Sequence, residues 1–556
     1  MSFQAVGSRP RQPLPRPVKP LSWELANHAK AYLEAAQYAN GYLFLESLLT
    51  AATSISVPAK PYVGYIAPAV QIALASTLIA YPHITTNAES ADASKGADAA
   101  LRYLRSLAST ITGPAYKIVR KAFLFPEDRT RRRAPARRSG SQSPGPENDI
   151  EQLACIAANA QSIWKLAEDF WHVVGWAFNC SVLHRARWER WKLWLESMLD
   201  FLEQDWNACV HSNGDGAAES LIWHYICSQT PTQRSNRRRI IQSIFTMGSA
   251  QDQKHFQEVW ASETRGPKPK EPIDNCLEKI DIEAGELGGF DYIDDDGLLK
   301  PAPTRSRRKI ASPSASSHSG DDIVVLSSKD AVSRLGGMEA ITLRQRLIAL
   351  LAEVSETMEM EFASPSVYFD DLTDEIRSLP TIMFELLLST SQLPIGSQIA
   401  LNANILLPFV SEQLPDYTKQ KLCQEDLEKM FLPIRANSHS FAANAKVSLV
   451  LEQLFSHMMR EGLLQPSKRL HQSLDRGVNS REKVQGSAKG KKGGDQEELS
   501  AKTVLEESSM RLRGLWEILQ VAAVPNTRSR LRHRASMKSS SLSLSSAPTM
   551  DIEMGE

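Results

Sequence analysis

Apolar residues recur at helical spacing in almost every part of this 556-residue chain, and this periodicity constrains the fold more than any other feature. Strand-like alternation is scarce, and most Pro and Gly residues fall between the periodic segments. We therefore predict an all-α protein: an irregular helical array, either HEAT-like or built of consecutive helical bundles, with long disordered linkers and tails. The sequence has no fixed repeat period, so the helices are expected to differ in length.

The order of apolar and polar stretches divides the chain into helical blocks and linkers. A hydrophobic content of 42% is typical of a folded protein, and Pro, Ser, Gly or Arg enrichment marks the boundaries. The predicted parts are a disordered N-terminus (1–20), helical block 1 (21–125), a basic disordered linker (126–148), a tryptophan-rich helical block 2 (149–260), a disordered acidic and Ser-rich linker (261–330), helical block 3 (331–465), a flexible linker (466–498), a C-terminal helix (499–522) and a disordered tail (523–556).

The cysteines and the first residues indicate an intracellular protein. Six cysteines occur without a CxxC pair, at positions 155, 180, 209, 227, 276 and 423. In so long a chain this spacing favours reduced thiols over a disulfide framework. The first twenty residues are rich in Pro and Arg and contain no apolar signal-peptide core, so secretion is not expected.

Residues 62–81 carry no charge and are almost long enough to span a bilayer. Pro68, Gln71, Ser76 and Thr77 interrupt the apolar run, and its flanks lack a dense Lys/Arg cluster. We therefore predict a buried core helix here and no membrane span.

A tryptophan-rich stripe dominates block 2. The residues of 187–206 that recur every three or four positions are Trp188, Trp191, Leu195, Met198, Leu202 and Trp206. Trp164, Trp171 and Trp176 are expected on the preceding helix, so the two helices are predicted to pack as an αα-hairpin. The alternative is a surface that stacks bases or anchors a peptide, which the interleaved Arg185, Arg187 and Arg190 would allow. Core packing is favoured because so much exposed indole would promote aggregation.

Two patterns could hold metal ions. Cys209 with His211 and His224 with Cys227 flank a loop, but one of these spacings is unusual for zinc and no CxxC supports them. Asp370, Asp371 and Asp374 form a DDxxD string that resembles the aspartate-rich, magnesium-binding motif of class I isoprenoid synthases. The second metal-binding motif that this resemblance implies is absent, and Ser364-Pro365 upstream predicts a helix start, where acidic residues are favoured.

Nucleotide-binding and hydrolase signatures are also missing from the sequence. Neither GxxxxGK[ST] nor GxGxxG follows a strand-like segment, and there is no GxSxG. We predict no enzymatic activity, no catalytic residue, no cofactor and no metal.

Two basic runs resemble nuclear-localisation signals, in which exposed Lys and Arg in a flexible segment are read by an import receptor. Their residues are Arg129, Arg131, Arg132, Arg133, Arg137 and Arg138 in the first run, and Arg305, Arg307, Arg308 and Lys309 in the second. They predict a nuclear location, and phosphate contacts to nucleic acid are the competing use.

Four consecutive β-forming residues stand out within the acidic and Ser-rich linker. The stretch DDIVVLSS places Asp321 and Asp322 before an apolar core of Ile323, Val324, Val325 and Leu326. It resembles a SUMO-interaction motif, and the resemblance implies that the core adds as a strand to the edge of the SUMO sheet while the acids face its basic rim. The alternative is a short edge strand or the lead-in to the next helix.

The leading hypothesis is a non-enzymatic nuclear scaffold or adaptor subunit of a chromatin or DNA-repair complex, binding other subunits through helical faces and SUMO or a SUMO-modified protein through its linker. The alternative is a helical subunit of an RNA-linked nuclear or nucleolar machine, such as ribosome assembly or transcription initiation. In that case the basic segments would contact nucleic acid directly.

Overall fold

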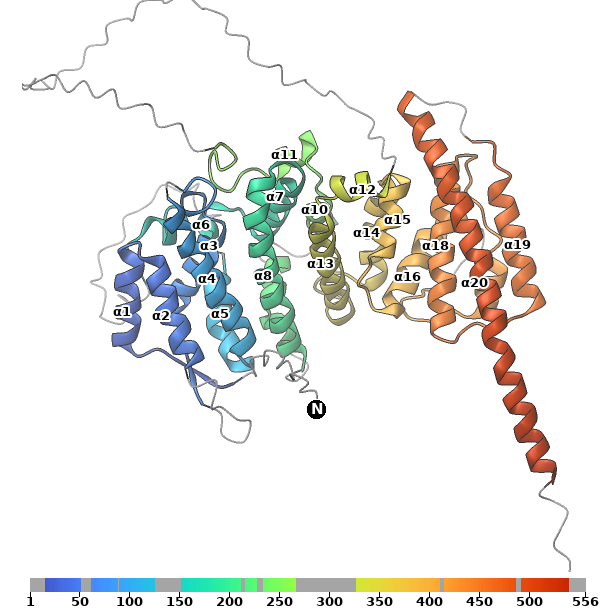
Figure 1. The fold of residues 1–556 in the computed structure, drawn as a ribbon, viewed down its shortest axis with the longest axis horizontal. Coiled ribbons are helices and arrows are strands. Elements are labelled where there is room, and N and C mark those ends of the chain that lie inside the picture. The colour runs from blue at the N-terminus through green and yellow to red at the C-terminus, as the bar shows by residue number, and fades with distance from the viewer. Residues whose placement is uncertain are drawn as a thin grey trace, which may run out of the picture. The chain divides into compact units, whose positions relative to one another are not determined.

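The computed structural model describes residues 16–51, 62–88, 90–125, 152–211, 216–227, 234–266, 327–410, 415–486 and 492–539. The prediction of an irregular all-α array is confirmed, since the described residues form twenty α-helices and one two-stranded sheet (Figure 1). Strands β1 (Val18–Pro20) and β2 (Gly64–Ile66) pair in parallel. Short 3-10 segments lie at Pro82–Ile84, Gly113–Ala115, Ile156–Ala158, Gly216–Glu219 and Leu407–Phe409, and a π-helical turn at Leu427–Phe431.

The first helices surround the uncharged segment. They are α1 (Trp23–Glu34), α2 (Tyr38–Thr50), α3 (Ala69–Ala80), α4 (Ala91–Thr110) and α5 (Tyr116–Phe123). Helix α3 contacts α4, α5 and α8, and nine of its twelve residues are buried. It is shorter than the expected 62–81, because Pro68 precedes its first turn and part of that stretch is strand β2.

Two buried polar side chains of α3 make hydrogen bonds inside the protein. Gln71 donates to the Ala26 carbonyl at 3.0 Å, and the Ser76 hydroxyl accepts a hydrogen bond from the Trp164 indole at 2.9 Å. The predicted core helix is therefore confirmed. None of the helices in the described part of the chain combines the length and the apolar character needed to cross a membrane.

The tryptophan-rich block contains α6 (Ile163–Leu166), α7 (Phe170–Leu183), α8 (Arg185–His211), α9 (Leu221–Cys227), α10 (Arg234–Phe245) and α11 (Ala250–His255). All six residues of the predicted stripe are at most 2% exposed, so core packing is confirmed and the base-stacking surface is excluded. Helices α7 and α8 pack together as predicted. Trp164, however, lies on α6, because Asp169 begins a new helix by accepting a hydrogen bond from the His172 amide.

The remaining helices follow the linker. They are α12 (Ser328–Arg334), α13 (Met338–Thr357), α14 (Pro365–Ser378), α15 (Thr381–Ser389), α16 (Ile395–Leu406), α17 (Gln424–Asp426), α18 (Phe441–Arg460), α19 (Lys468–Glu482) and α20 (Lys492–Ser539). Helix α18 contacts α15, α16, α19 and α20.

Several expected linker boundaries are wrong. Residues 18–20 form a strand, 468–482 form α19, and α20 extends beyond the predicted 499–522 in both directions. Helix α19 forms because Leu470, Leu474 and Val478 give it one buried face although its other residues are mostly polar.

Buried or partly buried arginines stabilise the ends of other elements. Their guanidinium groups donate to carbonyl oxygens at or just after the C-terminus of a neighbour, where helical carbonyls lack partners and a positive charge is favoured. The pairs are Arg16 with Leu49 and Ala51 after α2, Arg190 with Ile79 and Arg187 with Ala80 at α3, Arg344 with Ile244 and Thr246 at α10, and Arg481 with Leu432 and Ile434.

Residues before and after the 267–326 stretch belong to one compact unit. Helix α13 contacts α8 and α10, and α10 contacts α14. Arg346 of α13 bonds both carboxylate oxygens of Glu203 at 2.9 and 2.7 Å, and Asp200 at 2.7 Å. The helices on either side of the long linker are thus joined by direct polar contacts.

Candidate functional site

The residues that carry the predicted motifs lie outside the described part of the chain. These are the SUMO-like segment (Asp321, Asp322, Ile323, Val324, Val325 and Leu326) and the basic residues within 129–138 and 305–309. They stay predictions. The structure does describe the two points between which the SUMO-like segment and the second basic run are held.

The point at which the chain leaves the folded unit, before residue 267, is fixed by a buried ion pair. Glu263 is 2% exposed and pairs with Arg187, whose guanidinium also donates to the Ala80 carbonyl at 2.7 Å. The second carboxylate oxygen of Glu263 accepts the Val259 amide at 3.1 Å. Burial raises the pKa of Glu263, and the arginine opposes this rise. The chain therefore leaves the folded unit from a position anchored at the C-terminal end of α3.

The chain re-enters the folded unit at α12, whose N-cap residue, Ser327, directly follows Leu326. Ser327 caps this helix by accepting a hydrogen bond from the Asp330 amide at 3.2 Å, and its hydroxyl donates to the Asp330 carboxylate at 2.8 Å. After α12, Gly336 packs so closely on α7 that an added Cβ would lie 1.9 Å from the Ser181 hydroxyl. This contact holds the turn between α12 and α13 against the tryptophan-rich block.

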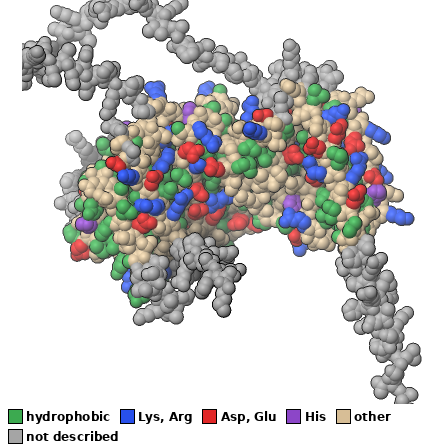
Figure 2. Space-filling view, viewed as in Figure 1, with side chains coloured by type: hydrophobic (Ala, Val, Ile, Leu, Met, Phe, Trp, Pro, Cys, Tyr) green, Lys and Arg blue, Asp and Glu red, His purple; other side chains and the backbone are tan. Residues whose placement is uncertain are grey.

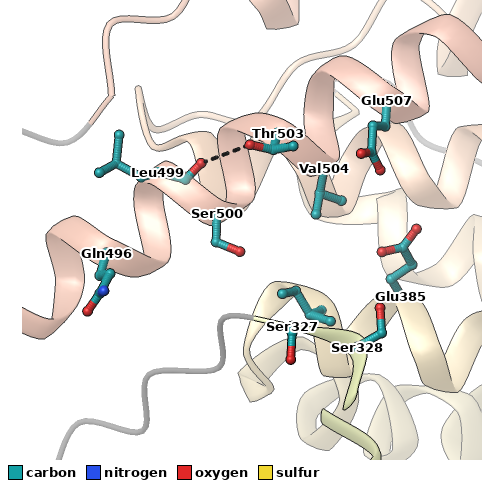
Figure 3. A pocket seen from close by; sticks show the side chains of 10 residues that line it. Ser327, Ser328, Glu385, Gln496, Leu499, Ser500, Thr503, Val504 and Glu507 are labelled. Atoms are coloured by element: carbon teal, nitrogen blue, oxygen red, sulfur yellow. Dashed lines mark hydrogen bonds between the residues drawn. The ribbon is translucent and has the colours of Figure 1, made fainter. Parts of the chain in front are cut away.

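Ser327 and Ser328 also line a cavity of 440 Å³ between α12, α15 and α20. Figure 3 shows the carboxylates of Glu385, from α15, and Glu507, from α20, facing each other across one end of this cavity. Hydroxyl groups of Ser500 and Thr503 add further polar atoms, so most of the lining is uncharged or acidic.

Arg511 of α20 balances the acidic side chains at this end of the cavity. It bonds Glu452 at 2.6 Å and Glu385 at 3.0 Å, and lies 3.8 Å from Glu507. Burial raises the pKa of Glu385, an effect that Arg511 opposes and the neighbouring carboxylates reinforce. Chemically, this cavity favours a cationic or hydrogen-bond-donating group over an anion.

The DDxxD carboxylates are engaged by neighbouring helices. Asp371 is 4% exposed and lies 3.1 Å from Arg237 of α10, while Asp374 lies 3.5 Å from Arg238. Asp370 accepts a hydrogen bond from the Asn404 amide at 2.9 Å. Ser364 caps α14 and Pro365 occupies its first turn, as the sequence predicts. These aspartates therefore join α14 to α10 and α16.

The structure describes the side chains of three of the four Cys/His residues that were considered as zinc ligands. The Cys209 thiol lies 2.8 Å from the Arg120 guanidinium, and burial raises its pKa to about 11. Arg120 also bonds the buried Asp205 at 2.8 Å. The side chain of His211 is outside the described residues. Among the side chains that are described, no group of three or more His, Cys, Asp or Glu is placed to hold a metal ion.

Sequence reasoning missed Glu263, Glu385 and Arg511. Glu263 closely follows Trp260 in a segment with little periodicity, and nothing local predicts its arginine partner 76 positions earlier. Glu385 did have a signal, because it is the single charged residue within the apolar helix α15 (TIMFELLLS).

Comparison with protein-family models, with curated proteins and with solved structures gave no match. The class of this protein is therefore defined by its fold alone, an irregular all-α helical array.

Proposed function

We propose that this chain is a non-enzymatic adaptor subunit of a nuclear protein complex, concerned with chromatin or DNA repair, whose helical array displays a recruiting linker. The adaptor binds stable partners through its helical faces, and Ile323–Leu326 recruits SUMO or a SUMO-modified protein by strand addition. The basic runs at 129–138 and 305–309 direct the chain to the nucleus.

One observation carries this proposal: the linker that contains the motif is fastened at both ends to a single folded unit. Glu263 holds one end through Arg187, and Ser327, the N-cap of α12, comes one residue after Leu326. A recruiting segment anchored in this way stays beside the partners that the helical faces hold. Its local concentration for a second contact on the same assembly is then high.

Surface charge supports protein partners over nucleic acid on one face. Figure 2 shows Lys and Arg side chains interspersed with Asp and Glu over the described surface in that view. A surface of mixed sign gives little of the sustained positive potential on which phosphate binding depends.

A second candidate function is favoured by helix α20. Its backbone remains helical to Ser539, through the basic run 528–538, which was expected to lie in a disordered tail. A basic helix can enter the major groove of a nucleic-acid duplex. The alternative is therefore a helical subunit of an RNA-linked nuclear or nucleolar machine.

The test compares SUMO binding by the full chain and by a variant with Ile323, Val324, Val325 and Leu326 changed to Ala, using isothermal titration calorimetry. The matched control changes four aliphatic residues of the same linker, Ile273, Leu277, Ile280 and Ile282, to Ala. We expect binding by the wild type and the control, and a loss of about tenfold or more in the variant, because the apolar core is removed.

Equal affinity of all three proteins, or no binding by any, would overturn the SUMO-recruiting proposal. The second candidate predicts instead a duplex affinity that falls steeply with salt and is lost when residues 528–538 are deleted.

A further inference from the structure

Helix α20 carries a second apolar face besides the one that packs on α18 and α19 (Figure 1). In the described part of the chain, eight large hydrophobic side chains are at least half exposed, and four of them belong to this helix. They are Leu499, Met510, Ile518 and Val521, which together are called the outer stripe. Single apolar side chains are normal on a protein surface, whereas several on one helix mark an interaction site.

The spacing of the outer stripe places its residues along one line. Leu499, Met510 and Val521 follow one another at intervals of eleven residues. Eleven residues complete three helical turns with about 20° to spare, so the three side chains project from the same side over about 33 Å of α20. The buried Leu505 and Leu512 project from the opposite side. The outer stripe is therefore not covered by the bundle to which α20 belongs.

Gly514 lies between Met510 and Ile518 on the same side of the helix, and nothing in the described fold explains it. Glycine is less favourable than alanine inside a helix, because its backbone loses more freedom on folding. A Cβ added at Gly514 would meet no described atom within 4 Å. Where a second helix lies across such a face, the missing Cβ lets the two backbones come close. The glycine therefore points to an occupant from outside this chain.

Charged residues on one edge of the outer stripe form a self-complementary pattern. Along α20 they alternate in sign, in the order Lys502, Glu506, Arg513 and Glu517. In an antiparallel pair of helices with Met510 facing Met510, Lys502 lies opposite Glu517 of the second copy. Glu506 lies opposite Arg513 in the same way. In a parallel pair each charge would face its own equivalent, so the pattern favours the antiparallel arrangement.

The contacts that these charges make within the chain are weak. Lys502 lies 3.9 Å from Glu506, and Arg513 lies 3.3 Å from Glu482 of α19. All four side chains are at least 31% exposed, and ion pairs with this exposure contribute little to stability. Glu517 is exposed as well. A second copy can therefore share these charged groups without breaking a buried contact.

We propose that this chain forms an antiparallel homodimer in which the outer stripes of two α20 helices pack against each other. Leu499 packs against Val521 of the second copy, and Met510 meets its equivalent on the two-fold axis. Apolar contacts and charge pairs are thus symmetric about the same point, as an interface between identical copies requires. That coincidence favours a second copy over an unrelated subunit. The inference is independent of SUMO recruitment, because Ile323–Leu326 take no part in it.

Sedimentation equilibrium of the full-length protein at about 50 µM tests the proposal through the mass of the particle. We expect about twice the chain mass of 61.8 kDa. Met510→Glu/Val521→Glu should lower the association constant about hundredfold or more, because carboxylates are then buried at the interface without partners. Both positions are exposed in the single chain, and circular dichroism checks that the variant remains folded. The matched control is Met360→Glu, an exposed methionine outside α20, which should leave the protein dimeric.

Exchange of charge tests the antiparallel register. Glu506→Arg and Arg513→Glu should each lower the association constant about tenfold, because like charges then face each other. An equimolar mixture of the two variants should regain the wild-type association, since the chain with two arginines fits the chain with two glutamates. Loss of a contact within one chain could not be rescued in this way.

Three results would overturn the proposal. The first is a wild type that is monomeric at this concentration, which would assign the outer stripe to a different subunit. The second is a Met510→Glu/Val521→Glu protein that stays dimeric, which would place the interface elsewhere. The third is a mixture of the two charge variants that associates no better than either variant alone.

Discussion

Arg344 offers the sharpest test of how the helices on either side of the linker are held together. Its side chain is 1% exposed, and its guanidinium donates to the carbonyls of Ile244 and Thr246, the latter at 2.8 Å. The same group lies over the Phe178 ring, 4.0 Å from the ring centroid. One arginine that follows the linker thus contacts two helices that precede it.

The expected cost of replacing Arg344 by Met follows from these contacts. Two hydrogen bonds from a charged donor contribute about 1.5–3 kcal/mol each, and the variant leaves two buried carbonyls without a donor. Against this, burial lowers the pKa of Arg344 to about 9, so the buried charge, still protonated at pH 7, lacks much of its hydration. The lower part of the combined range of about 3–6 kcal/mol therefore applies, and we expect Arg344→Met to lose about 3–4 kcal/mol of stability.

A different physical argument predicts that Arg344→Met leaves the stability unchanged or raises it. Replacing a buried charge by an apolar side chain of similar volume is often neutral or stabilising by about 1–4 kcal/mol. The two predictions differ in whether the carbonyls of Ile244 and Thr246 need the hydrogen bonds that the guanidinium donates. Since they lie at the C-terminal end of α10 and are bonded by this guanidinium, the variant gains no hydration in exchange for the bonds it loses.

Thermal unfolding followed by tryptophan fluorescence and circular dichroism measures the effect. We expect a midpoint several degrees lower, since 1 kcal/mol corresponds to about 2–4 °C in a domain of 150–250 residues and to less in a larger one. The control is Arg185→Met, an exposed arginine with an i,i+4 partner, which should change stability by less than about 0.5 kcal/mol. An Arg344→Met protein as stable as the wild type would refute the carbonyl-capping argument.

Three further predictions concern other contacts. Gly336→Ala should lose about 3 kcal/mol of stability because the added Cβ would lie 1.9 Å from the Ser181 hydroxyl. Gly337→Ala, at a similar positive φ but with more space, should lose about 1 kcal/mol. Equal melting temperatures of the two variants would contradict this. Burial lowers the pKa of His172, whose Nδ1 accepts a hydrogen bond from the Glu168 amide, so the contribution of the neutral imidazole to folding stability should be full above about pH 6.5 and decline as the pH falls. His172→Asn should therefore flatten the change in melting temperature between about pH 7.5 and 5.5. An unchanged slope would contradict this prediction. Asp371→Asn should cost about 1–3 kcal/mol of stability because the ion pair with Arg237 is lost. Excess Mg²⁺ should not shift the melting temperature of the wild type. A rise in melting temperature with Mg²⁺ would instead support a metal site at these aspartates.

Local pattern was sufficient for the fold class and for much of the core. The spacing of Trp188, Trp191 and Leu195 predicts one buried face whatever surrounds it, and all three are buried. The same holds for α3, where the absence of charge predicts burial directly. The helix start at Ser364 and Pro365 was predicted correctly, but Asp370, Asp371 and Asp374 lie beyond the first turn of α14, so the expected stabilisation of these acids by the helix start was wrong.

Composition was a poorer guide than periodicity. Residues 466–498 were expected to form a linker because Lys, Arg, Ser and Gly dominate them, yet Leu470, Leu474 and Val478 recur every four residues within that stretch. Three apolar side chains on one face are enough to hold a helix when the rest of its surface contacts water.

Sequence periodicity can also predict which arginines are buried. Arg344 continues the spacing of Ile341, Ile348 and Leu351, so periodicity alone places its side chain on the buried face of α13. An arginine at such a position must find acceptors in the interior, because a buried charge without hydrogen bonds is too costly.

Arg481 repeats this relation in α19, where it follows Leu470, Leu474 and Val478 at helical spacing and donates to the carbonyls of Leu432 and Ile434. Both arginines meet carbonyl oxygens at or near the end of another element, which are the acceptors a packed helical array always has in excess. An arginine within an apolar helical stripe therefore predicts that another element ends beside it. It does not predict which one, because Arg344 and its acceptor Ile244 are 100 residues apart and only the folded chain brings them together.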